Sequence, residues 1–270
     1  HSTTQQNIET LKAHGNILIA PQSGELASGL TGMGRLEEPQ KIVEILASFF
    51  TKQQSLAGKN VLISSGPTVE PIDPVRYISN HSSGQMGNSL ALEAASRGAK
   101  VTLVSGPVSE YPKHPSVQVV RVTTAAEMYT ACTEYFASAH IAIMAAAVAD
   151  YTPEQPEKEK IKKSGDGFRI NLVKTLDILA ELGKRKIKGQ FLVGFALETN
   201  NEVEHAMQKL HTKNLDFIVL NSLKDAGSGF GVATNKISII DKDQSITEFS
   251  LKSKPEVAAD ILDAVQNRLV

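Results

Sequence analysis

A long polar segment at residues 64–87, SSGPTVEPIDPVRYISNHSSGQMG, holds the densest group of side chains able to bind a substrate. It is far longer than the usual strand-to-helix loop of about 2–6 residues, and such long loops are typical of functional sites. Glycines directly before a helix let the backbone approach a phosphate, and a helix N-terminus favours an anion. A polar surface loop is the alternative. The candidate binding residues of this segment are Arg76, Asn80, His81, Ser82 and Gly84.

Asp150 ends the apolar stretch AAAVAD at residues 145–150. At the carboxyl end of a strand, this carboxylate could hold Mg²⁺ bound to a triphosphate, because magnesium prefers oxygen ligands and often takes only one or two from protein. A helix cap or a turn aspartate explains the residue equally well.

Lysines could supply contacts to phosphates. The run EKEKIKK at residues 157–163 is usually explained as a solvated face, and its functional interpretation is a mobile flap that brings Lys160 over a polyphosphate. Lys209 and Lys213 lie on one face of a predicted helix, which is also ordinary for a surface. Phe195, at the end of a predicted strand, fits either the core or contact with a base.

Several other chemistries are not supported by the sequence. It has no P-loop, no G-x-G-x-x-G fingerprint and no G-x-S-x-G elbow. The 7 histidines are scattered, and the single cysteine, Cys132, cannot form an internal disulfide. Cys132 falls inside a predicted helix, so we interpret it as a packing residue.

Alternating strands and helices must position these side chains. Apolar runs predict strands at residues 61–66, 101–106, 117–122, 141–148, 191–196 and 217–220, and helices lie between them. This pattern predicts an α/β fold with a doubly wound, mostly parallel, Rossmann-like sheet and a late β-hairpin at residues 236–251. Ligands of such sheets bind at the carboxyl ends of the strands, beside a topological switch. The segments after Gly66, Gly106, Ala147 and Gly194 are therefore the expected site.

Composition agrees with a globular α/β chain. The 270 residues are 41% apolar and 21% charged with a net charge of −1, which gives no basic excess for nucleic acid. No apolar run approaches the ~20 residues of a membrane span, so we expect a soluble protein. The chain begins at His1 rather than Met, and we expect it to be a fragment of a longer chain.

A polar break at residues 51–60 divides the chain. The first 50 residues are too few to bury much core. They predict a helix at 7–14, a strand at 17–20, a glycine-rich loop at 24–35 and a helix from Pro39. The apolar face of that last helix comprises Ile42, Val43, Leu46, Phe49 and Phe50. These residues read as an N-terminal appendage.

Four segments in this order, GPTVEPIDPVRYISNHSSGQMG, AAAVADY, EKEKIKK and VGFALETNN, closely resemble the bacterial phosphopantothenoylcysteine synthetase family, the ligase half of the bifunctional coenzyme A biosynthesis protein. The resemblance covers residues 59–270, with 51–58 as a linker. It implies that the carboxylate of 4′-phosphopantothenate attacks the α-phosphate of CTP, giving an acyl-cytidylate and pyrophosphate. The amine of cysteine then displaces CMP and forms 4′-phosphopantothenoylcysteine.

The resemblance also implies roles for individual residues. Asn80 matches the asparagine that handles the acyl intermediate through amide hydrogen bonds to its carbonyl. Lys160 matches the flap lysine of the activation step, and Asp150 matches the aspartate near the triphosphate and Mg²⁺. Arg76, His81, Ser82 and Gly84 share the substrate-binding loop. The implied nucleotide site comprises Met144, Ala145, Ala146, Asp150, Lys160, Leu176, Asp177, Ile178, Leu179, Phe195, Lys209 and Lys213. The family's usual KNPDI reads KTLDI at residues 174–178, which keeps Asp177 and alters the base pocket.

Residues 1–50 are similar to the tail of the flavin-dependent phosphopantothenoylcysteine decarboxylase, whose substrate clamp resembles GELASGLTGMGRLEEP. The usual ACG of that clamp is Ala27-Ser28-Gly29 here, and a hydroxyl is a much poorer acid than a thiol. We therefore expect neither FMN nor decarboxylation for this chain. The fused bacterial form implies CTP rather than ATP, and a cytoplasmic homodimer through the ligase domain. We expect the late hairpin to contribute to that contact, and a higher oligomer where the full decarboxylase domain is present.

Two other classes stay open. A nucleotide-binding module without ligase chemistry would bind CTP and release no pyrophosphate. A structural remnant beside a decarboxylase would have no nucleotide affinity.

Overall fold

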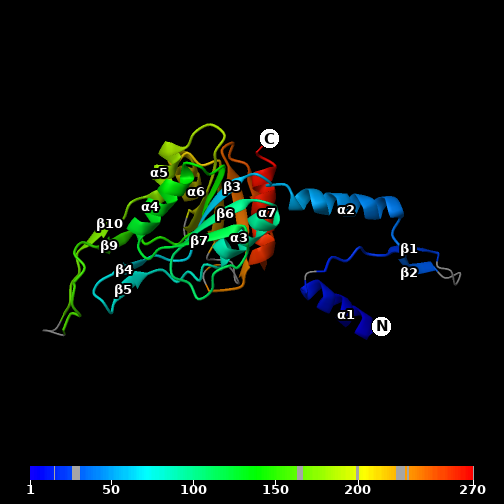
Figure 1. Cartoon of the computed structure of the whole chain (residues 1–270), viewed down its shortest axis with the longest axis horizontal. Coiled ribbons are helices and arrows are strands. Elements are labelled where there is room, and N and C mark those ends of the chain that lie inside the picture. Colours follow the sequence, from blue (N-terminus) through cyan, green and yellow to red (C-terminus); the bar gives the residue numbers. More distant parts are fainter. Residues whose placement is uncertain are drawn as a thin grey trace. The chain divides into compact units, whose positions relative to one another are not determined.

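The computed structural model describes residues 1–14, 16–25, 31–162, 167–198, 201–222, 229 and 231–269. The chain divides into two compact units, His1–Gln53 and Gln54–Val270 (Figure 1). Among the described helices, none combines the length and apolar character that a membrane crossing requires.

The first unit is a helix, a hairpin and a second helix. Helix α1 spans Ser2–Ala13, strands β1 (Gln22–Glu25) and β2 (Thr31–Arg35) pair antiparallel, and α2 spans Pro39–Gln53. The predicted strand at 17–20 does not form, and the hairpin occupies part of the predicted glycine-rich loop. On the predicted apolar face of α2, Val43 and Phe50 are 64% and 60% exposed. Ser28 lies outside the described residues.

The polar break is shorter than expected from its composition. Helix α2 continues to Gln53, and Leu56 is fully buried in the core of the second unit. The backbone N–H of Leu56 donates to the carbonyl oxygen of Arg97 at 2.9 Å, which fixes this turn to the end of a core helix.

An eight-stranded sheet forms the centre of the second unit, in the order β15-β14-β12-β11-β8-β3-β6-β7. The parallel strands β7, β6, β3, β8, β11 and β12 give the doubly wound order, in which the sequence runs outward in both directions from the centre. Strands β14 and β15 add the late antiparallel hairpin. The predicted fold class is confirmed. The bounds are β3 (Asn60–Ser65), β6 (Lys100–Ser105), β7 (Val117–Arg121), β8 (Ile141–Met144), β11 (Phe191–Glu198), β12 (Phe217–Ser222), β14 (Ile237–Asp241) and β15 (Ile246–Glu248).

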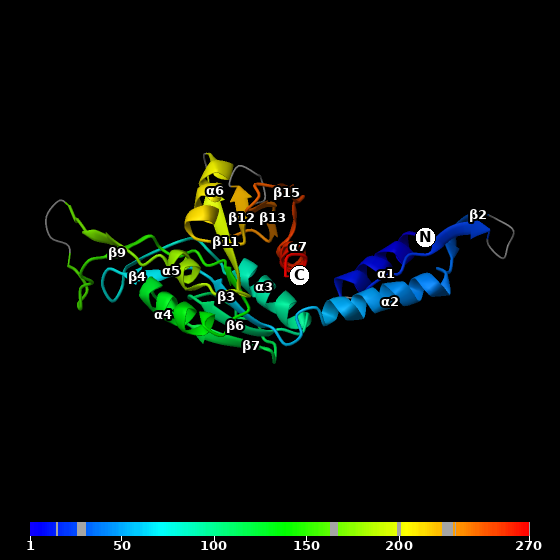
Figure 2. The same ribbon diagram turned by 90° about the horizontal axis from the view of Figure 1, so that it is seen from above.

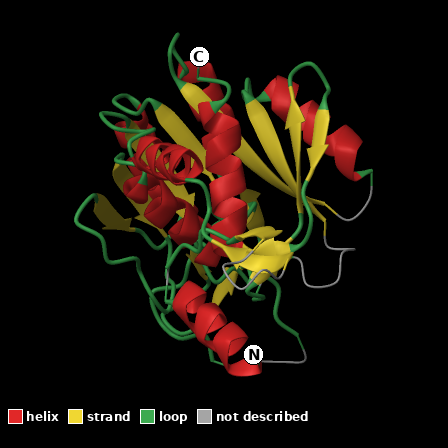
Figure 3. Ribbon diagram, turned by 90° about the vertical axis from the view of Figure 1, so that its right-hand side faces the viewer, coloured by secondary structure: helices red, strands yellow, loops and turns green. Residues whose placement is uncertain are grey.

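Helices cover both faces of this sheet (Figure 3). Helices α3 (Gln85–Ser96) and α7 (Lys254–Gln266) pack together on one face, as Figure 2 shows. Helices α4 (Ala125–Phe136), α5 (Ile178–Arg185) and α6 (Glu202–Thr212) cover the other. Within β3, Val61 and Ile63 join the core under α3 and α7, while Leu62 joins the opposite core. Burial on both faces is why the strands are continuously apolar.

Cys132 of α4 is fully buried in this second core. Burial raises the pKa of its thiol to about 12, because a thiolate would lose its hydration there. Its interpretation as a packing residue is consistent with both observations.

Three short antiparallel strand pairs form separate two-stranded sheets in the second unit. They are β4 (Val69–Pro71) with β5 (Tyr77–Ser79), β9 (Tyr151–Pro153) with β10 (Leu172–Lys174), and β13 (Thr234–Asn235) with β16 (Lys252–Ser253). The sequence pattern did not predict them, because strands of two or three residues are too short to show a hydrophobic period.

Candidate functional site

Two adjoining cavities lie over the topological switch, where the neighbouring strands β3 and β8 end. The first measures about 310 Å³ and the second about 480 Å³. They share part of their walls, so a group in one can reach a group in the other. The shared residues are Ala146, Val148, Asp150 and Phe195.

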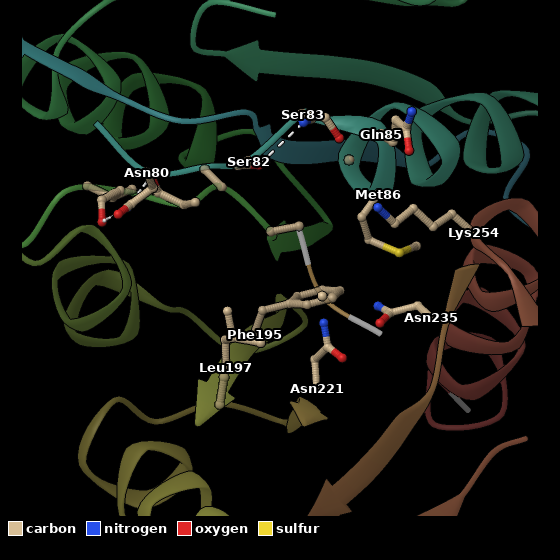
Figure 4. Close-up of a pocket in the computed structure, with 18 of the residues that line it drawn as sticks. Asn80, Ser82, Ser83, Gln85, Met86, Phe195, Leu197, Asn221, Asn235 and Lys254 are labelled. Carbon is tan, nitrogen blue, oxygen red and sulfur yellow. Dashed lines mark hydrogen bonds between the residues drawn. The ribbon is translucent and has the colours of Figure 1, made fainter. Parts of the chain in front are cut away.

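The N-terminus of α3 forms one wall of the first cavity (Figure 4). Gly84 precedes the helix at φ +75°, and Ser65 Oγ donates to its carbonyl oxygen at 3.0 Å. A Cβ on Gly87 would lie 2.5 Å from Ser65 Cβ, so only glycine lets the first turn of α3 pack this closely on β3. The exposed N–H groups of that turn therefore face a site at the strand end, which suits an anion.

Asn80 links the segment that follows β3 to the segment that follows β8. Its Nδ2 donates to the carbonyl oxygens of Ala147 and Val148, at 3.0 and 3.2 Å. Both amide hydrogens are thereby engaged, and Oδ1 is left to accept. The family resemblance implies an amide N–H directed at an acyl carbonyl. In this structure the side chain offers the cavity an acceptor.

The second cavity has an apolar wall and a basic edge. Met144, Leu176, Ile178, Leu179 and Phe195 supply the wall. Lys213 lies at the edge, with its Nζ 2.9 Å from a carboxylate oxygen of Asp177. An apolar slot beside a cation can take a base and its phosphates.

Asp177 begins α5 as its N-cap, accepting from the N–H of Ala180 at 2.9 Å. Burial raises the pKa of Asp177, but the hydrogen bond from Ala180 and the charge of Lys213 outweigh it and hold the pKa below its usual value. The carboxylate is therefore ionised wherever it must hold Lys213 in place.

Thr175 stands within the altered KTLDI segment. Its hydroxyl donates to the carbonyl oxygen of Ala149 at 2.6 Å, and its N–H donates to that of Asp150 at 3.0 Å. The segment is thus fixed to the end of the AAAVAD stretch, so the second cavity keeps a defined wall despite the changed motif.

Asp150 lies where the two cavities meet, with its side chain exposed. No group of three His, Cys, Asp or Glu residues that could hold a metal occurs within the described ranges. One accessible carboxylate fits Mg²⁺ that takes its remaining ligands from phosphates and water, and it does not fit a metal held by protein alone.

Four predicted site residues lie outside both cavities. His81 and Lys160 are exposed, and Arg76 is turned toward Asp73 and the carbonyl oxygen of Ile161. Lys209 on α6 is close enough to Asp177 to lower its pKa. The structure therefore brings together Asn80, Ser82, Gly84, Met144, Ala145, Ala146, Asp150, Leu176, Asp177, Ile178, Leu179, Phe195 and Lys213.

Sequence reasoning missed several lining residues. Asn221, Asn235 and Lys254 complete the first cavity, and Ser64 accepts from the N–H of Ala146 beside the second. Each comes from a separate element, β12, β13, α7 or β3, and no spacing along the chain connects them.

A doubly wound sheet with paired cavities over its switch defines a Rossmann-like α/β protein with a small-molecule site. The chain belongs to the family of the DNA/pantothenate metabolism flavoprotein C-terminal domain, which it matches over residues 56–269.

Relatives extend this assignment. The chain is 56% identical to a cysteine/cysteine sulfinic acid decarboxylase of an unknown prokaryotic organism, over 97% of this chain and 74% of that protein. It is 46% identical to the coenzyme A biosynthesis bifunctional protein CoaBC of Haemophilus influenzae, over 99% of this chain and 66% of that protein. The crystal structure of a CoaBC C-terminal domain matches 80% of this chain and 98% of that domain, with a TM-score of 0.68 and 39% identity.

Proposed function

We propose that the second unit is a phosphopantothenate–cysteine ligase of coenzyme A biosynthesis. The observation that carries the proposal is the pair of cavities that meet at Asp150 and Phe195, because a ligase that activates an acid with a nucleotide must hold both substrates against each other. The likeness to CoaBC proteins supports the same reaction.

In the activation step, the second cavity holds the nucleotide, CTP, with its base against Phe195 and its phosphates toward Lys213. Asp150 would hold Mg²⁺, which neutralises charge on the triphosphate when bound. The carboxylate of 4′-phosphopantothenate lies in the first cavity near Ala146 and attacks the α-phosphate, so pyrophosphate leaves. Lys160 acts from its exposed segment when that segment closes over the phosphates.

In the second step, the amine of cysteine attacks the acyl carbon and CMP leaves. We assign to Asn80 Oδ1 the role of accepting a hydrogen bond from that amine, since its Nδ2 is engaged with Ala147 and Val148. Ser82 and Gly84 line the same cavity and hold the acid. Arg76 and His81 are proposed to bind substrate only after their loop rearranges.

The relative named as a decarboxylase suggests a competing activity. The second unit corresponds to the CoaBC C-terminal domain, which it matches over 98% of that domain, and this likeness favours ligation for the second unit.

The experiment measures pyrophosphate release from CTP with Mg²⁺ and phosphopantothenate, in the absence of cysteine. The ligase predicts release that depends on phosphopantothenate, followed by CMP and the amide once cysteine is added. Parallel reactions with ATP test the nucleotide preference, and CO₂ release from cysteine tests decarboxylation. If the chain binds CTP but releases no pyrophosphate, the ligase proposal is wrong and the chain is a nucleotide-binding module. If it does not bind CTP at all, the chain is a structural remnant.

We further propose a cytoplasmic homodimer formed through the second unit, with a larger assembly when a complete flavoprotein half is attached. Sedimentation equilibrium of the chain tests the dimer, and a monomer at every concentration would contradict it. Substitution of Ile246, which is 45% exposed on the edge strand β15, tests the hairpin contact.

A further inference from the structure

Thr68 is a polar residue with no exposed surface, and no step of the proposed reaction uses it. It lines neither cavity, yet three of its polar groups are hydrogen-bonded to the segments around the site. Its N–H donates to the carbonyl oxygen of Ala147 at 3.3 Å, and its hydroxyl oxygen accepts from the N–H of Ala149 at 2.9 Å. Its carbonyl oxygen accepts from the hydroxyl of Ser79 at 2.8 Å. Thr68 therefore connects the chain just before Asn80 to the chain just before Asp150.

The hydrogen-bond ladder between β3 and β8 continues past the ends of both strands. The N–H of Ala147 donates to the carbonyl oxygen of Gly66 at 2.9 Å, and Pro67 and Ala147 form a parallel bridge. In a regular parallel ladder each further bond of this kind lies two residues along both segments. The next bond in the series would therefore join the N–H of Ala149 to the carbonyl oxygen of Thr68.

At that step, the hydroxyl of Thr68 takes the place of its carbonyl oxygen. The N–H of Ala149 donates to Thr68 Oγ1, while the carbonyl oxygen of Thr68 accepts from Ser79. The chain then leaves the eight-stranded sheet, because β9 pairs with β10 in a separate sheet. The side chain of Thr68 thus holds the backbone at the point where its direction changes.

A second threonine holds the same stretch of backbone from another element. The hydroxyl of Thr175 donates to the carbonyl oxygen of Ala149, and its N–H donates to that of Asp150. Ala149 is 5% exposed, so water cannot readily replace these partners, and a buried peptide group left unpaired is costly. The backbone that leads into Asp150 is therefore fixed by Thr68 on one side and by Thr175 on the other.

This backbone carries the carboxylate at the junction of the site. Asp150 lines both cavities. An aspartate side chain is short, so the place of its carboxylate follows the place of its backbone. Because a misplacement of about 1 Å can cost up to 10²-fold in rate, the attachment of Ala149 has consequences for chemistry at Asp150.

We propose that Thr68 is a positioning residue for Asp150, whose hydroxyl fixes Ala149 and thereby sets where the carboxylate meets the metal-bound triphosphate. The part played by Asp150 rests on the proposed function, whereas the attachment of Ala149 to Thr68 does not. Thr175 lines the nucleotide cavity, so the experiments use Thr68, which touches no substrate.

The first experiment measures CTP binding to the whole chain by calorimetry, with Mg²⁺ and with EDTA. Thr68→Val keeps the shape of the side chain and removes the acceptor, so the tightening of CTP binding by Mg²⁺ should fall severalfold. Thr68→Ser keeps the hydroxyl and should restore most of it. The matched control is Thr133→Val, the same change at a buried hydroxyl of α4 outside both cavities. An unchanged effect of Mg²⁺ in Thr68→Val, or an equal loss in the control, would overturn the proposal.

The second experiment asks whether Thr68 acts through Asp150. Thr68→Val should lower the kcat of pyrophosphate release by roughly tenfold. In an Asp150→Asn background the same change should have little further effect, because two residues that act as one unit are not additive. Equal slowing in both backgrounds would assign Thr68 a merely structural role.

A third readout requires neither ligand nor activity. Hydrogen exchange of the Ala149 amide, followed by NMR, should be slow in the wild type and in Thr68→Ser and much faster in Thr68→Val. Rapid exchange in the wild-type chain would overturn the proposal without any variant. Slow exchange that Thr68→Val abolishes, in a chain that releases no pyrophosphate from CTP, would keep the attachment and reject the proposed function. Pyrophosphate release at the wild-type rate in Thr68→Val would reject the positioning role alone.

Discussion

Arg76 donates a 2.9 Å hydrogen bond from its guanidinium to the carbonyl oxygen of Ile161, 85 residues further along the chain. Asp73 completes the link, because its buried carboxylate accepts from the Arg76 guanidinium and, at 3.1 Å, from the N–H of Ile161. The substrate loop after β4 is thus fastened to the base of the lysine-rich segment. Lys160 directly precedes this anchor, so the anchor sets where the lysine can reach.

Asp73→Asn tests the anchor. In the carboxylate, Oδ2 accepts from the Arg76 guanidinium and from the N–H of Ile161, while Oδ1 accepts from the N–H groups of Val75 and Arg76. The amide has one acceptor oxygen in place of two, so it cannot serve both sets of donors and loses the charge that pairs with Arg76. We expect pyrophosphate release to slow by roughly tenfold or more, since a misplacement of about 1 Å can cost up to 10²-fold. Asp243→Asn is the control, because Asp243 also accepts hydrogen bonds but lies in an exposed turn distant in sequence from the loop. Equal slowing in both variants would contradict the anchor.

The environment of Asp73 also implies that the free energy of unfolding falls at acidic pH. The hydrogen bond from Arg76 holds the pKa of Asp73 well below its usual value, and burial opposes this only partly. A carboxyl whose pKa is lowered in the folded state stabilises the protein above its unfolded pKa of about 3.9, and the contribution is lost as the pH falls through the folded value. Urea unfolding at pH 7 and pH 3 measures this loss. Asp73→Asn should be less stable at pH 7 and should lose less on acidification than the wild type does.

Asn80→Asp should separate the two chemical steps. A carboxylate oxygen would replace the Nδ2 donor opposite the carbonyl oxygens of Ala147 and Val148, and the repulsion would shift the side chain. We expect pyrophosphate release to persist, because Asn80 does not line the nucleotide cavity, while amide formation slows by roughly 10²-fold. Single-turnover measurements of both products check this. Equal loss of the two steps would assign Asn80 a merely structural role.

Lys160→Gln should slow activation and leave the fold unchanged. Lys160 is exposed, and exposed substitutions usually change stability by no more than about 0.5 kcal/mol. Loss of one charge-stabilising donor costs about 10²–10³-fold in comparable sites. The neighbouring exposed Lys158→Gln is the control for net charge. A large drop in melting temperature, or an equal effect in both variants, would point away from catalysis.

Substitutions of Asp177 and of Lys213 should have different effects, the first on the stability of the fold and the second on nucleotide binding. Asp177→Ala removes the N-cap of α5 and should lower the free energy of unfolding by about 1 kcal/mol. Lys213→Met keeps the cap and should raise the KM for CTP with little change in stability, because a partly exposed ion pair contributes at most about 1 kcal/mol. Lys184→Met, at the far end of α5, is the control. An unchanged KM in Lys213→Met would remove this lysine from the phosphate site.

Local pattern was enough to predict most of the fold. Six parallel strands are buried on both faces, namely β3, β6, β7, β8, β11 and β12. Because both faces need apolar side chains, each strand appears in the sequence as an uninterrupted apolar run. Capping boxes at Thr124 and Ser253 begin α4 and α7, and each depends on two residues three positions apart. The short strand pairs carried no comparable period, so they were visible only in the structure. Helix α5 is amphipathic, with Ile178 and Leu182 buried, but it is only 8 residues long and was not predicted.

The sequence by itself determined the elements and the motif loops, including Asn80, Asp150 and the lysine-rich segment, because these depend on neighbours within one stretch of chain. Only the tertiary structure decided which side chains meet. It directed Arg76 to Ile161 and away from the cavities, engaged the amide of Asn80, and brought Lys254 of α7 to the first turn of α3. The physical reason is that a doubly wound sheet gathers strand ends from distant parts of the chain at one edge, and no spacing along the sequence records that convergence.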